Sequence, residues 1–388
     1  MKNQLLLLGF ILLIGFACQT KEPELQATPL SEQNLEFEIY DSLVVDYLGN
    51  VTLMDISPDG KSYLLIDQNT DSIFVTNSLG KIIHTYKRFG EGPENYPTSR
   101  IGMAKFLDEN NYLIPTMTAL FQYDLEGNLI RQLKPDYTGR VTTLMPYLQV
   151  HFVKNGKVYL HLPGRYGDLG EQGLEYQANA RQLEVIDLQT GKFNSAVPFP
   201  SYSKYSSDTR EFGAGDFLPI LSVHEDSLYL IFKNEPKIFT YNLSNLEIPA
   251  SVKQIPFTEF IESKEDQSQE NGSFNLRNFF VGNIYSVFAI EGGEFLISYL
   301  QGLSDEAANQ VISEGGSDFQ KIFKEAGKIN SGGMVLFNGN VLSPVIEKSE
   351  MLGSLNLFVS KDEIWFSLNF SEAENDYSVI YKTRLVQK

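Results

Sequence analysis

The sequence predicts an all-β fold, a six-bladed β-propeller with four antiparallel strands in each blade. Short apolar runs separated by tight-turn residues continue almost to the end of the chain, which is typical of all-β proteins. Two kinds of turn alternate along these runs. The four-strand unit that they mark recurs about every 40 to 60 residues, the spacing of propeller blades.

The first kind of turn joins two strands rich in Val, Ile, Leu, Phe and Tyr, as at Ser57–Lys61 and Lys154–Lys157. Its Asp-Gly and Asn-Gly pairs favour the positive φ angles of two-residue hairpins. The second kind follows a strand that ends in Asp or Asn, as at Asn77–Lys81 and Asp124–Asn128. Each pair of turns therefore brackets four strands. A β-sandwich is the alternative for a series of short strands, but it does not explain why the two turns alternate.

Counting these units predicts blades near 51–87, 101–134, 148–199, 218–257, 284–347 and 353–388. The last blade has only three clear strands, and an unassigned strand-like run, LEFEIYDSLVV, lies near the N-terminus at 35–45. Pairing this run with the C-terminal strands completes the sixth blade and closes the ring, which leaves fewer exposed strand edges.

A small helical insertion is predicted near 303–327, within the long segment 302–332. Ser317 and Gln320 have capping-box spacing, and Gly327 is the expected stop. Asp305–Ile312 is expected to form a preceding helical turn. The insertion either caps its own blade or acts as a lid, and its apolar stripe consists of Phe319, Ile322, Phe323 and Ala326.

The N-terminus is typical of an exported protein. Lys2 is followed by an apolar run, Leu5–Phe16, which suits a signal peptide and is too short for a membrane-spanning helix. Gly15–Cys18 resembles the lipobox of bacterial lipoproteins, in which the cysteine carries a lipid, although that pattern usually has Leu where Gly15 stands. Cys18 is the only cysteine of the chain, so it cannot form an internal disulfide. An incidental cysteine in a discarded signal peptide is the alternative.

Three regions are therefore expected: a lipoprotein signal peptide at 1–17, a lipidated Cys18 with a flexible tether at 18–33, and a single, monomeric propeller at 34–388. The tether is rich in polar residues and proline. Its charges after Cys18 resemble a surface-export signal, or belong to an ordinary linker. The predicted location is the cell envelope, with the lipid anchored in the outer membrane at its periplasmic face or at the cell surface.

The composition excludes nucleic acid as a partner. The chain has 31 Lys and Arg against 49 Asp and Glu, a net charge of -18. Such a surface repels nucleic acid, which is bound by basic patches. The hydrophobic content of 42% is high enough for a sizeable core, so the mature chain is expected to fold.

The chain resembles the six-bladed β-propeller lipoproteins of Bacteroidota, most of which are domains of unknown function. The resemblance covers about 35–388. Its most specific part is Phe89–Tyr96, which contains Gly90, Gly92 and Pro93 and has Asn-Tyr where the family usually has Glu-Phe. The resemblance implies a fold and a location but no activity.

The long segments of the chain are all predicted to lie on one face of the propeller, which we call the long-loop face. In a blade, the first and third turns lie on one rim, and the second turn and the link to the next blade lie on the other. The first and third turns are short throughout, and we call their rim the plain face. Long loops in a compact fold are usually functional or disordered. The long segments are 88–100, 134–147, 163–181, 200–217, 258–283 and 302–332.

Several of these segments combine Tyr and Arg, the residue types that anchor interfaces. More than half of such residues are expected merely to pack over blade edges. The candidate ligand-binding residues are Arg88, Tyr96, Arg100, Arg165, Tyr166, Tyr202, Tyr205, Arg210 and Arg277.

No complete catalytic or metal-binding motif is present: the sequence has neither a His-Glu-x-x-His nor a Gly-x-Ser-x-Gly pattern. The histidines are expected to be structural. His161 is the exception that could have a functional role, because it ends a strand just below the loop that carries Arg165. Two functions stay open. The first is a binding module without cofactor, whose long-loop face holds a glycan, a peptide or a protein. The second is a calcium-dependent lactonase- or esterase-type hydrolase or lyase with carboxylates at the central channel.

Overall fold

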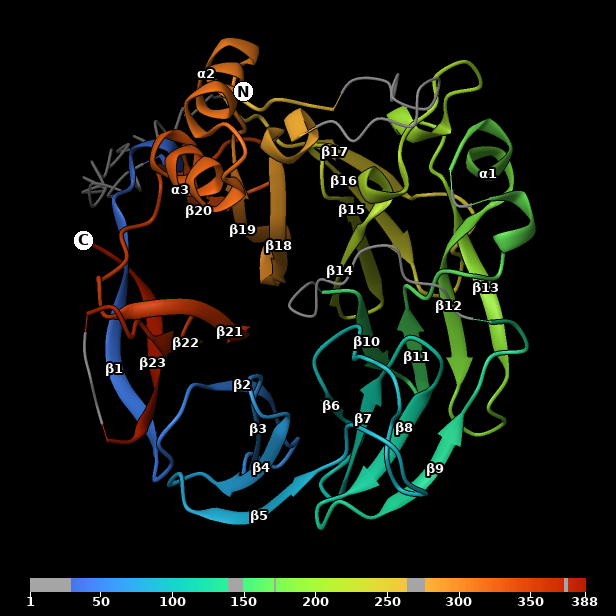
Figure 1. The fold of residues 1–388 in the computed structure, drawn as a ribbon, viewed down its shortest axis with the longest axis vertical. Helices are drawn as coiled ribbons and strands as arrows, with labels where there is room; N and C mark the ends of the chain where they lie inside the picture. Colours follow the sequence, from blue (N-terminus) through green and yellow to red (C-terminus); the bar gives the residue numbers. More distant parts are fainter. Residues whose placement is uncertain (1–28, 139–148, 171, 264–275, 373–375) are drawn as a thin grey trace, which may run out of the picture.

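The computed structural model describes residues 29–138, 149–170, 172–263, 276–372 and 376–388. Its strands form six antiparallel sheets arranged in a ring around a central axis (Figure 1). The predicted six-bladed β-propeller is therefore confirmed. The signal peptide, Cys18 and most of the expected tether lie outside the described residues.

The first three blades each have four strands in sequence order from the axis outward. Blade 1 consists of β2 (Val51–Ile56), β3 (Ser62–Asp67), β4 (Ser72–Asn77) and β5 (Ile82–Lys87). Blade 2 consists of β6 (Lys105–Phe106), β7 (Asn111–Pro115), β8 (Leu120–Asp124) and β9 (Leu129–Leu133). Blade 3 consists of β10 (His151–Lys154), β11 (Lys157–Leu160), β12 (Arg181–Asp187) and β13 (Phe193–Pro198).

The other three blades include the ring closure. Blade 4 consists of β14 (Pro219–His224), β15 (Ser227–Phe232), β16 (Lys237–Asn242) and β17 (Ser251–Gln254). Blade 5 contains β18 (Asn283–Ile290), β19 (Glu294–Leu300) and β20 (Gly332–Phe337). Blade 6 consists of β21 (Leu352–Ser360), β22 (Glu363–Leu368), β23 (Ser378–Gln387) and, as its outer strand, β1 (Leu35–Val45).

The ring closes as the sequence predicted. β1 pairs antiparallel with β23, from Leu35 opposite Gln387 to Val45 opposite Ser378. The fold begins slightly before the expected boundary, because Leu30 is buried in the cluster between blades 5 and 6. The last residues of the expected tether thus pack on the propeller.

Blade 5 departs from the expected four regular strands, since its described sheet has three. The segment after β20 still follows it in the antiparallel sense: Ser343 N–H donates to Leu336 O and Ile346 N–H to Met334 O, both at 2.8 Å. Pro344 has no N–H to donate, which explains why this outer strand is irregular.

The predicted hairpin geometry is present at the turn between β10 and β11. Asn155 and Gly156 have φ angles of 51° and 69°. Positive φ at both central residues matches the twist of the flanking strands, and Asn and Gly tolerate it.

The helices lie mostly in the long segments. The described helices are η1 (Leu30–Glu32), η2 (Gly167–Leu169), α1 (Leu174–Asn179), η3 (Lys204–Ser206), η4 (Ala214–Phe217), η6 (Leu276–Phe280), η7 (Glu291–Gly293), α2 (Asp305–Gly315) and α3 (Phe319–Ile329). Among the residues that the structure describes, no helix has the length and apolar character needed to span a bilayer.

The insertion between β19 and β20 is a helical hairpin, as predicted, but two of its details were wrong. The N-cap of α3 is Asp318 and not Ser317, because the Asp318 side chain accepts a hydrogen bond from Lys321 N–H. Gly327 does not end α3, which continues to Ile329. A glycine inside a helix costs about 1 kcal/mol relative to alanine, which packing of the apolar stripe offsets.

This hairpin has a small core of its own. Ile322 and Ala326 of α3 pack with Ala308 and Val311 of α2 and with Phe280 of η6. The other two residues of the predicted stripe, Phe319 and Phe323, are 53% and 44% exposed. The hairpin therefore rests on the link that leads into blade 5 instead of merging with the main core.

The main core consists of apolar clusters between neighbouring blades, and polar side chains join the inner strands at the axis. Asn356 of β21 accepts from Leu53 N–H, Asp55 of β2 accepts from Phe106 N–H, and Ser222 of β14 accepts from Ala289 N–H. These bonds satisfy backbone groups at the inner sheet edges, which have no further strand to pair with.

Candidate functional site

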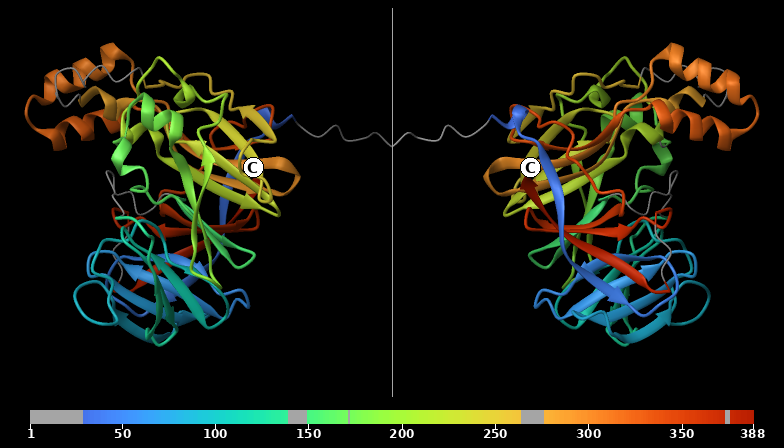
Figure 2. Two further views of the ribbon diagram at one scale, coloured as in Figure 1. Left: turned by 90° about the vertical axis from the view of Figure 1, so that its right-hand side faces the viewer. Right: turned by 90° about the vertical axis from the view of Figure 1, so that its left-hand side faces the viewer.

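The long segments lie on one face, as predicted from the alternation of turns. The antiparallel order places the β11–β12 and β19–β20 connections on the same rim as the links between blades. In Figure 2 the helices α1, α2 and α3 lie on one side of the molecule, whereas η1 and the C-terminus lie on the other. Both ends of the described chain therefore leave from the plain face. Segment 134–147 is described only up to residue 138.

The predicted basic residues of these segments mostly connect one loop to another. Arg100, in the link after blade 1, is 3.6 Å from Asp71 in the β3–β4 turn, and its side chain is only 8% exposed. Arg277 of η6 donates to Asp305 at the start of α2 at 2.7 Å. Arg88 donates to Gly127 O at 2.6 Å. These three guanidiniums pin links to neighbouring turns.

Arg165 makes the most complete of these contacts. Its guanidinium donates to both oxygens of the buried Glu184, at 2.6 and 2.9 Å, and lies 4.6 Å from the ring centre of Tyr137. Asp136 lies 3.4 Å from the same guanidinium. The carboxylate of Glu184 raises the pKa of Arg165. Bidentate pairs of this kind fix the geometry of both partners.

The predicted tyrosines separate into buried and exposed members. Tyr96 and Tyr205 have no exposed surface and lie in the core between blades 1 and 2 and between blades 3 and 4. Tyr166 is partly buried against the second of these clusters. Tyr202 is 70% exposed. Arg210 is also exposed, and its guanidinium lies 5.7 Å from the Phe212 ring centre.

The glycine-rich motif Phe89–Tyr96 positions the Tyr96 side chain in the core. Gly90 N–H donates to Tyr96 O, and Tyr96 N–H donates to Arg88 O at 2.7 Å. The φ angles of Gly90 and Gly92 are 124° and 142°, which only glycine adopts readily. Pro93 continues the same loop. The aromatic position of the motif is thus a packing position, whichever of Phe or Tyr fills it.

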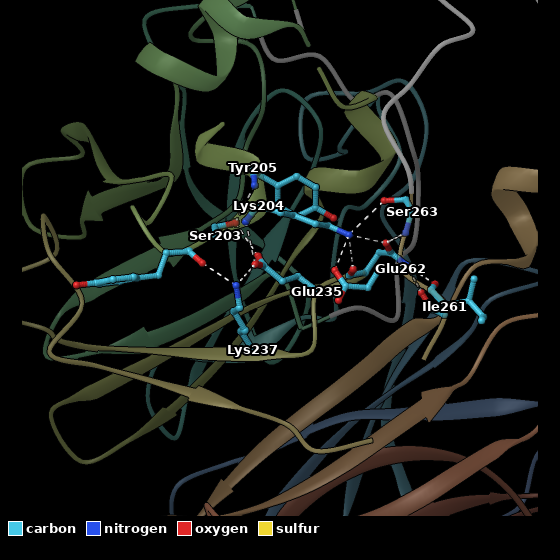
Figure 3. A network of polar contacts seen from close by, with 11 residues as sticks. Ser203, Lys204, Tyr205, Glu235, Lys237, Ile261, Glu262 and Ser263 are labelled. Carbon is cyan, nitrogen blue, oxygen red and sulfur yellow. Dashed lines mark hydrogen bonds and ion pairs between the residues drawn. The ribbon is translucent and has the colours of Figure 1, made fainter. Parts of the chain in front are cut away.

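A dense cluster of polar contacts surrounds Glu235, in the β15–β16 turn (Figure 3). Glu235 is 1% exposed and accepts from Ser203 Oγ at 2.6 Å, from Lys204 N–H at 3.0 Å and from Lys237 Nζ at 3.0 Å. Lys237 also donates to Tyr202 O at 2.7 Å. One buried carboxylate therefore holds the turn that carries the exposed Tyr202.

The ammonium of Lys204 completes this cluster on its other side. It donates to Asn234 O at 2.8 Å and to Asn234 Oδ1 at 2.9 Å, and it lies 3.1 Å from Glu262. Burial lowers the pKa of Lys204, and the Glu262 carboxylate opposes that shift. Asn234 further accepts from Ser263 N–H. The links before and after blade 4 are thus joined through one turn.

Two histidines of blade 3 are buried and have lowered pKa values. Burial lowers the pKa of His161 to about 4, while its Nδ1–H donates to Gln182 O at 2.8 Å. Burial, assisted by Lys105, lowers the pKa of His151 to about 3. Both His151 ring nitrogens lie buried and lack a hydrogen bond of normal geometry in the described ranges, and the nearby Met103 backbone only partly opposes the downward shift. A neutral imidazole is therefore present at both positions near neutral pH.

The described residues contain no group of three or more His, Cys, Asp or Glu that could hold a metal ion. The carboxylates expected for a calcium-dependent enzyme at the channel are thus not assembled within these ranges. Asp55, the acid of the inner strand of blade 1, is engaged instead with Lys105 at 3.1 Å.

Sequence reasoning did not find Asn234, Glu235, Lys237 or Lys233. They lie in a short turn, Lys-Asn-Glu-Pro-Lys, that is indistinguishable in the sequence from any solvated connection. Only the two long links folding over it make it a buried centre.

Comparison with known proteins gives the fold. A family model described as "6-bladed beta-propeller" (DUF5128) matches residues 35–161. A solved structure from Bacteroides vulgatus, a member of the DUF4221 family, is similar with a TM-score of 0.61 at 14% identity, covering 92% of this chain and 99% of that one. This likeness is one of fold alone. A search of curated proteins found no match.

Two further solved structures resemble the chain more loosely. A streptogramin B lyase has a TM-score of 0.42 at 12% identity, with 93% of this chain and 100% of that chain covered. The extracellular domain of a putative one-component system from B. thetaiotaomicron has a TM-score of 0.39 at 13% identity, with 89% and 40% covered. The resemblance inferred from the sequence is confirmed: the chain is a six-bladed β-propeller, similar to propeller families of Bacteroidota, and its N-terminal third matches the DUF5128 family model.

Proposed function

We propose that this protein is an extracytoplasmic binding module that holds a glycan, peptide or protein partner on its long-loop face. The observation that carries the proposal is the asymmetry of the two faces. The helices and long links lie on one side, and both ends of the described chain leave from the other. A lipid on Cys18 would place the membrane on the plain side, so the long-loop face would point away from it.

The turn around Tyr202 supports this proposal. Its backbone is fixed by Lys237, by the Ser203–Glu235 hydrogen bond and by Ser206 Oγ, which donates to Ser201 O. The Tyr202 side chain is nevertheless 70% exposed. A rigid turn that presents an aromatic ring to solvent avoids the entropic cost of ordering a contact residue on binding.

Blocking one face at a time tests the proposal. The chain from Pro29 retains all six blades and has no cysteine, so single cysteines can be introduced at the exposed Asp208 of the long-loop face and the exposed Lys81 of the plain face. Each variant is coupled to polyethylene glycol, and its binding to isolated cell envelopes of the source bacterium is measured. We expect saturable binding that a chain at position 208 blocks and a chain at position 81 leaves intact. Equal effects at both positions, or no saturable binding, would contradict the proposal.

The lipid anchor needs its own test. Cells expressing the full chain are fed an alkyne-tagged fatty acid, and the label on the protein is measured for the natural chain and for Cys18→Ala. We expect label on the natural chain only, together with release of the variant from the membrane fraction. Equal labelling of both would place the lipid elsewhere or show that none is attached to Cys18.

A further inference from the structure

Lys233 occupies a special position at the long-loop end of blade 4. Its N–H donates to Leu218 O at 3.0 Å, and its carbonyl accepts from Ile284 N–H at 2.8 Å. Leu218 directly precedes β14, and Ile284 lies at the start of β18. The Lys233 backbone therefore joins the inner strands of two neighbouring blades at the point where both begin.

The ammonium group of Lys233 lacks the partners that its neighbours have. It is partly buried, and within the described ranges no hydrogen bond or ion pair engages it. Burial lowers the pKa of Lys233, and Asp216 of η4 opposes this shift through space. A charge withdrawn from water without a partner is costly, and groups perturbed in this way are enriched at functional sites.

Tyr285 lies next to this position on β18. The β18–β19 pairing passes from Ile284 opposite Tyr299 directly to Ser286 opposite Ser298, so Tyr285 is the extra residue of a β-bulge. Bulges re-aim side chains and are over-represented beside binding sites. The Tyr285 side chain is 38% exposed, and in the described part of the chain neither its ring nor its hydroxyl has a partner.

We propose that Lys233 and Tyr285 form a binding site for an organic carboxylate at the long-loop end of the inner strands of blades 4 and 5. The site rests on the proposed binding function of this face and names the chemistry that it recognises. An ammonium and a phenol supply charged and neutral donors to the two oxygens of a carboxylate, and the tyrosine ring supplies an apolar surface beside it. A phosphate dianion fits less well, because a single ammonium faces it and Asp216 lies close by.

Calorimetric titration with benzoate tests the site, with benzamide as the uncharged analogue of the same shape and phenylphosphonate as the dianion. The protein is the chain from Pro29. We expect saturable benzoate binding, with benzamide and phenylphosphonate each at least about tenfold weaker. Lys233→Met should weaken benzoate binding at least about tenfold, and Tyr285→Phe about threefold. Lys81→Met, at an exposed lysine of the plain face, should leave it unchanged.

Competitive acetylation keeps the test independent of variant folding. In the unmodified protein, benzoate should slow acetylation of Lys233 and leave that of Lys81 unaffected. The proposal fails if benzoate does not bind saturably up to about 10 mM, well beyond the millimolar affinity of a weak specific contact. It also fails if benzamide binds equally well, or if Lys233→Met binds benzoate like the natural chain.

The two proposals can fail separately. If polyethylene glycol at position 208 blocks envelope binding but Lys233→Met binds neither less envelope nor less benzoate, the binding face stands and the carboxylate site falls. If benzoate binding depends on Lys233 but polyethylene glycol at neither position 208 nor position 81 reduces envelope binding, the carboxylate site stands and the proposed function falls.

Discussion

Two polar regions of the long-loop face differ in whether their buried ionisable groups have partners. At the junction of blades 3 and 4, Glu235, Lys204 and Lys237 satisfy one another and the loops around them. Beside the inner strands, Lys233 and His151 are withdrawn from water, and in the described ranges neither ionisable group makes an ion pair or a hydrogen bond of normal geometry. The difference teaches that a buried charge in a loop is structural when its partners are in place, and is a candidate contact for a ligand when they are not.

The largest expected effect on stability follows from removing the Glu235 carboxylate. Glu235→Ala should lower the free energy of unfolding by about 3 to 5 kcal/mol, because Lys237 would lose its buried carboxylate, and Ser203 Oγ and the Lys204 N–H would lose their acceptor. Chemical denaturation measures this effect. Glu235→Gln keeps the shape and one acceptor and should cost less. A loss below about 1 kcal/mol for Glu235→Ala would show that the cluster does not hold the turn.

His151 should make the free energy of unfolding depend on pH in the acid range. Since burial lowers the pKa of His151 to about 3, the native state stays neutral while the unfolded chain takes up a proton below about pH 6.5. Stability is therefore lost as the pH falls from about 6.5 towards 3, by up to about 4 kcal/mol. Denaturation of the natural chain and His151→Phe across this range measures the difference. Parallel curves would contradict an unpaired, buried imidazole.

Removing the unpaired lysine should have a smaller effect of the opposite sign. Lys233→Met should raise the free energy of unfolding by up to about 1 kcal/mol near neutral pH, because it removes a partly buried charge that Asp216 compensates only through space and keeps an unbranched side chain. A destabilisation would mean that the ammonium is satisfied in the folded protein.

The same variant makes a pH-dependent prediction. Because the pKa of Lys233 is lowered in the folded state, its cost is full below that pKa and disappears as the pH rises towards 10.5, where the unfolded chain also loses the proton. The advantage of Lys233→Met should therefore shrink with rising pH. Denaturation of both proteins at pH 7 and above measures it, and a constant advantage would point to packing instead of charge.

The smallest effect on stability is expected at Tyr202. Its ring is exposed, so Tyr202→Ala should change the free energy of unfolding by less than about 0.5 kcal/mol. Envelope binding should nevertheless fall if this ring is a contact. If Tyr202→Ala binds envelopes as well as the natural chain, Tyr202 is not part of the binding surface.

The sequence was sufficient for the architecture. The residues of a turn are selected by its local backbone geometry, as at Asn155–Gly156, where positive φ angles favour Asn and Gly. The alternation of two turn types along the sequence therefore predicted both the blades and the face that carries the long loops. The closure by β1 followed from counting strands. The cap at Asp318 was missed because Ser317 offers an equally good capping side chain one residue earlier, and only the helix geometry chooses between them.

The polar sites were decided by tertiary structure alone. The sequence could select Arg165 and Tyr205 as unusual loop residues, but not that Glu184 binds the first and that the core encloses the second. It gave no sign of Lys233, whose surroundings are built from Leu218 and Ile284 on two other strands. Strand periodicity and turn preference act over a few residues and can be read from the chain, whereas burial and pairing of a charge depend on residues that only the closed ring brings together.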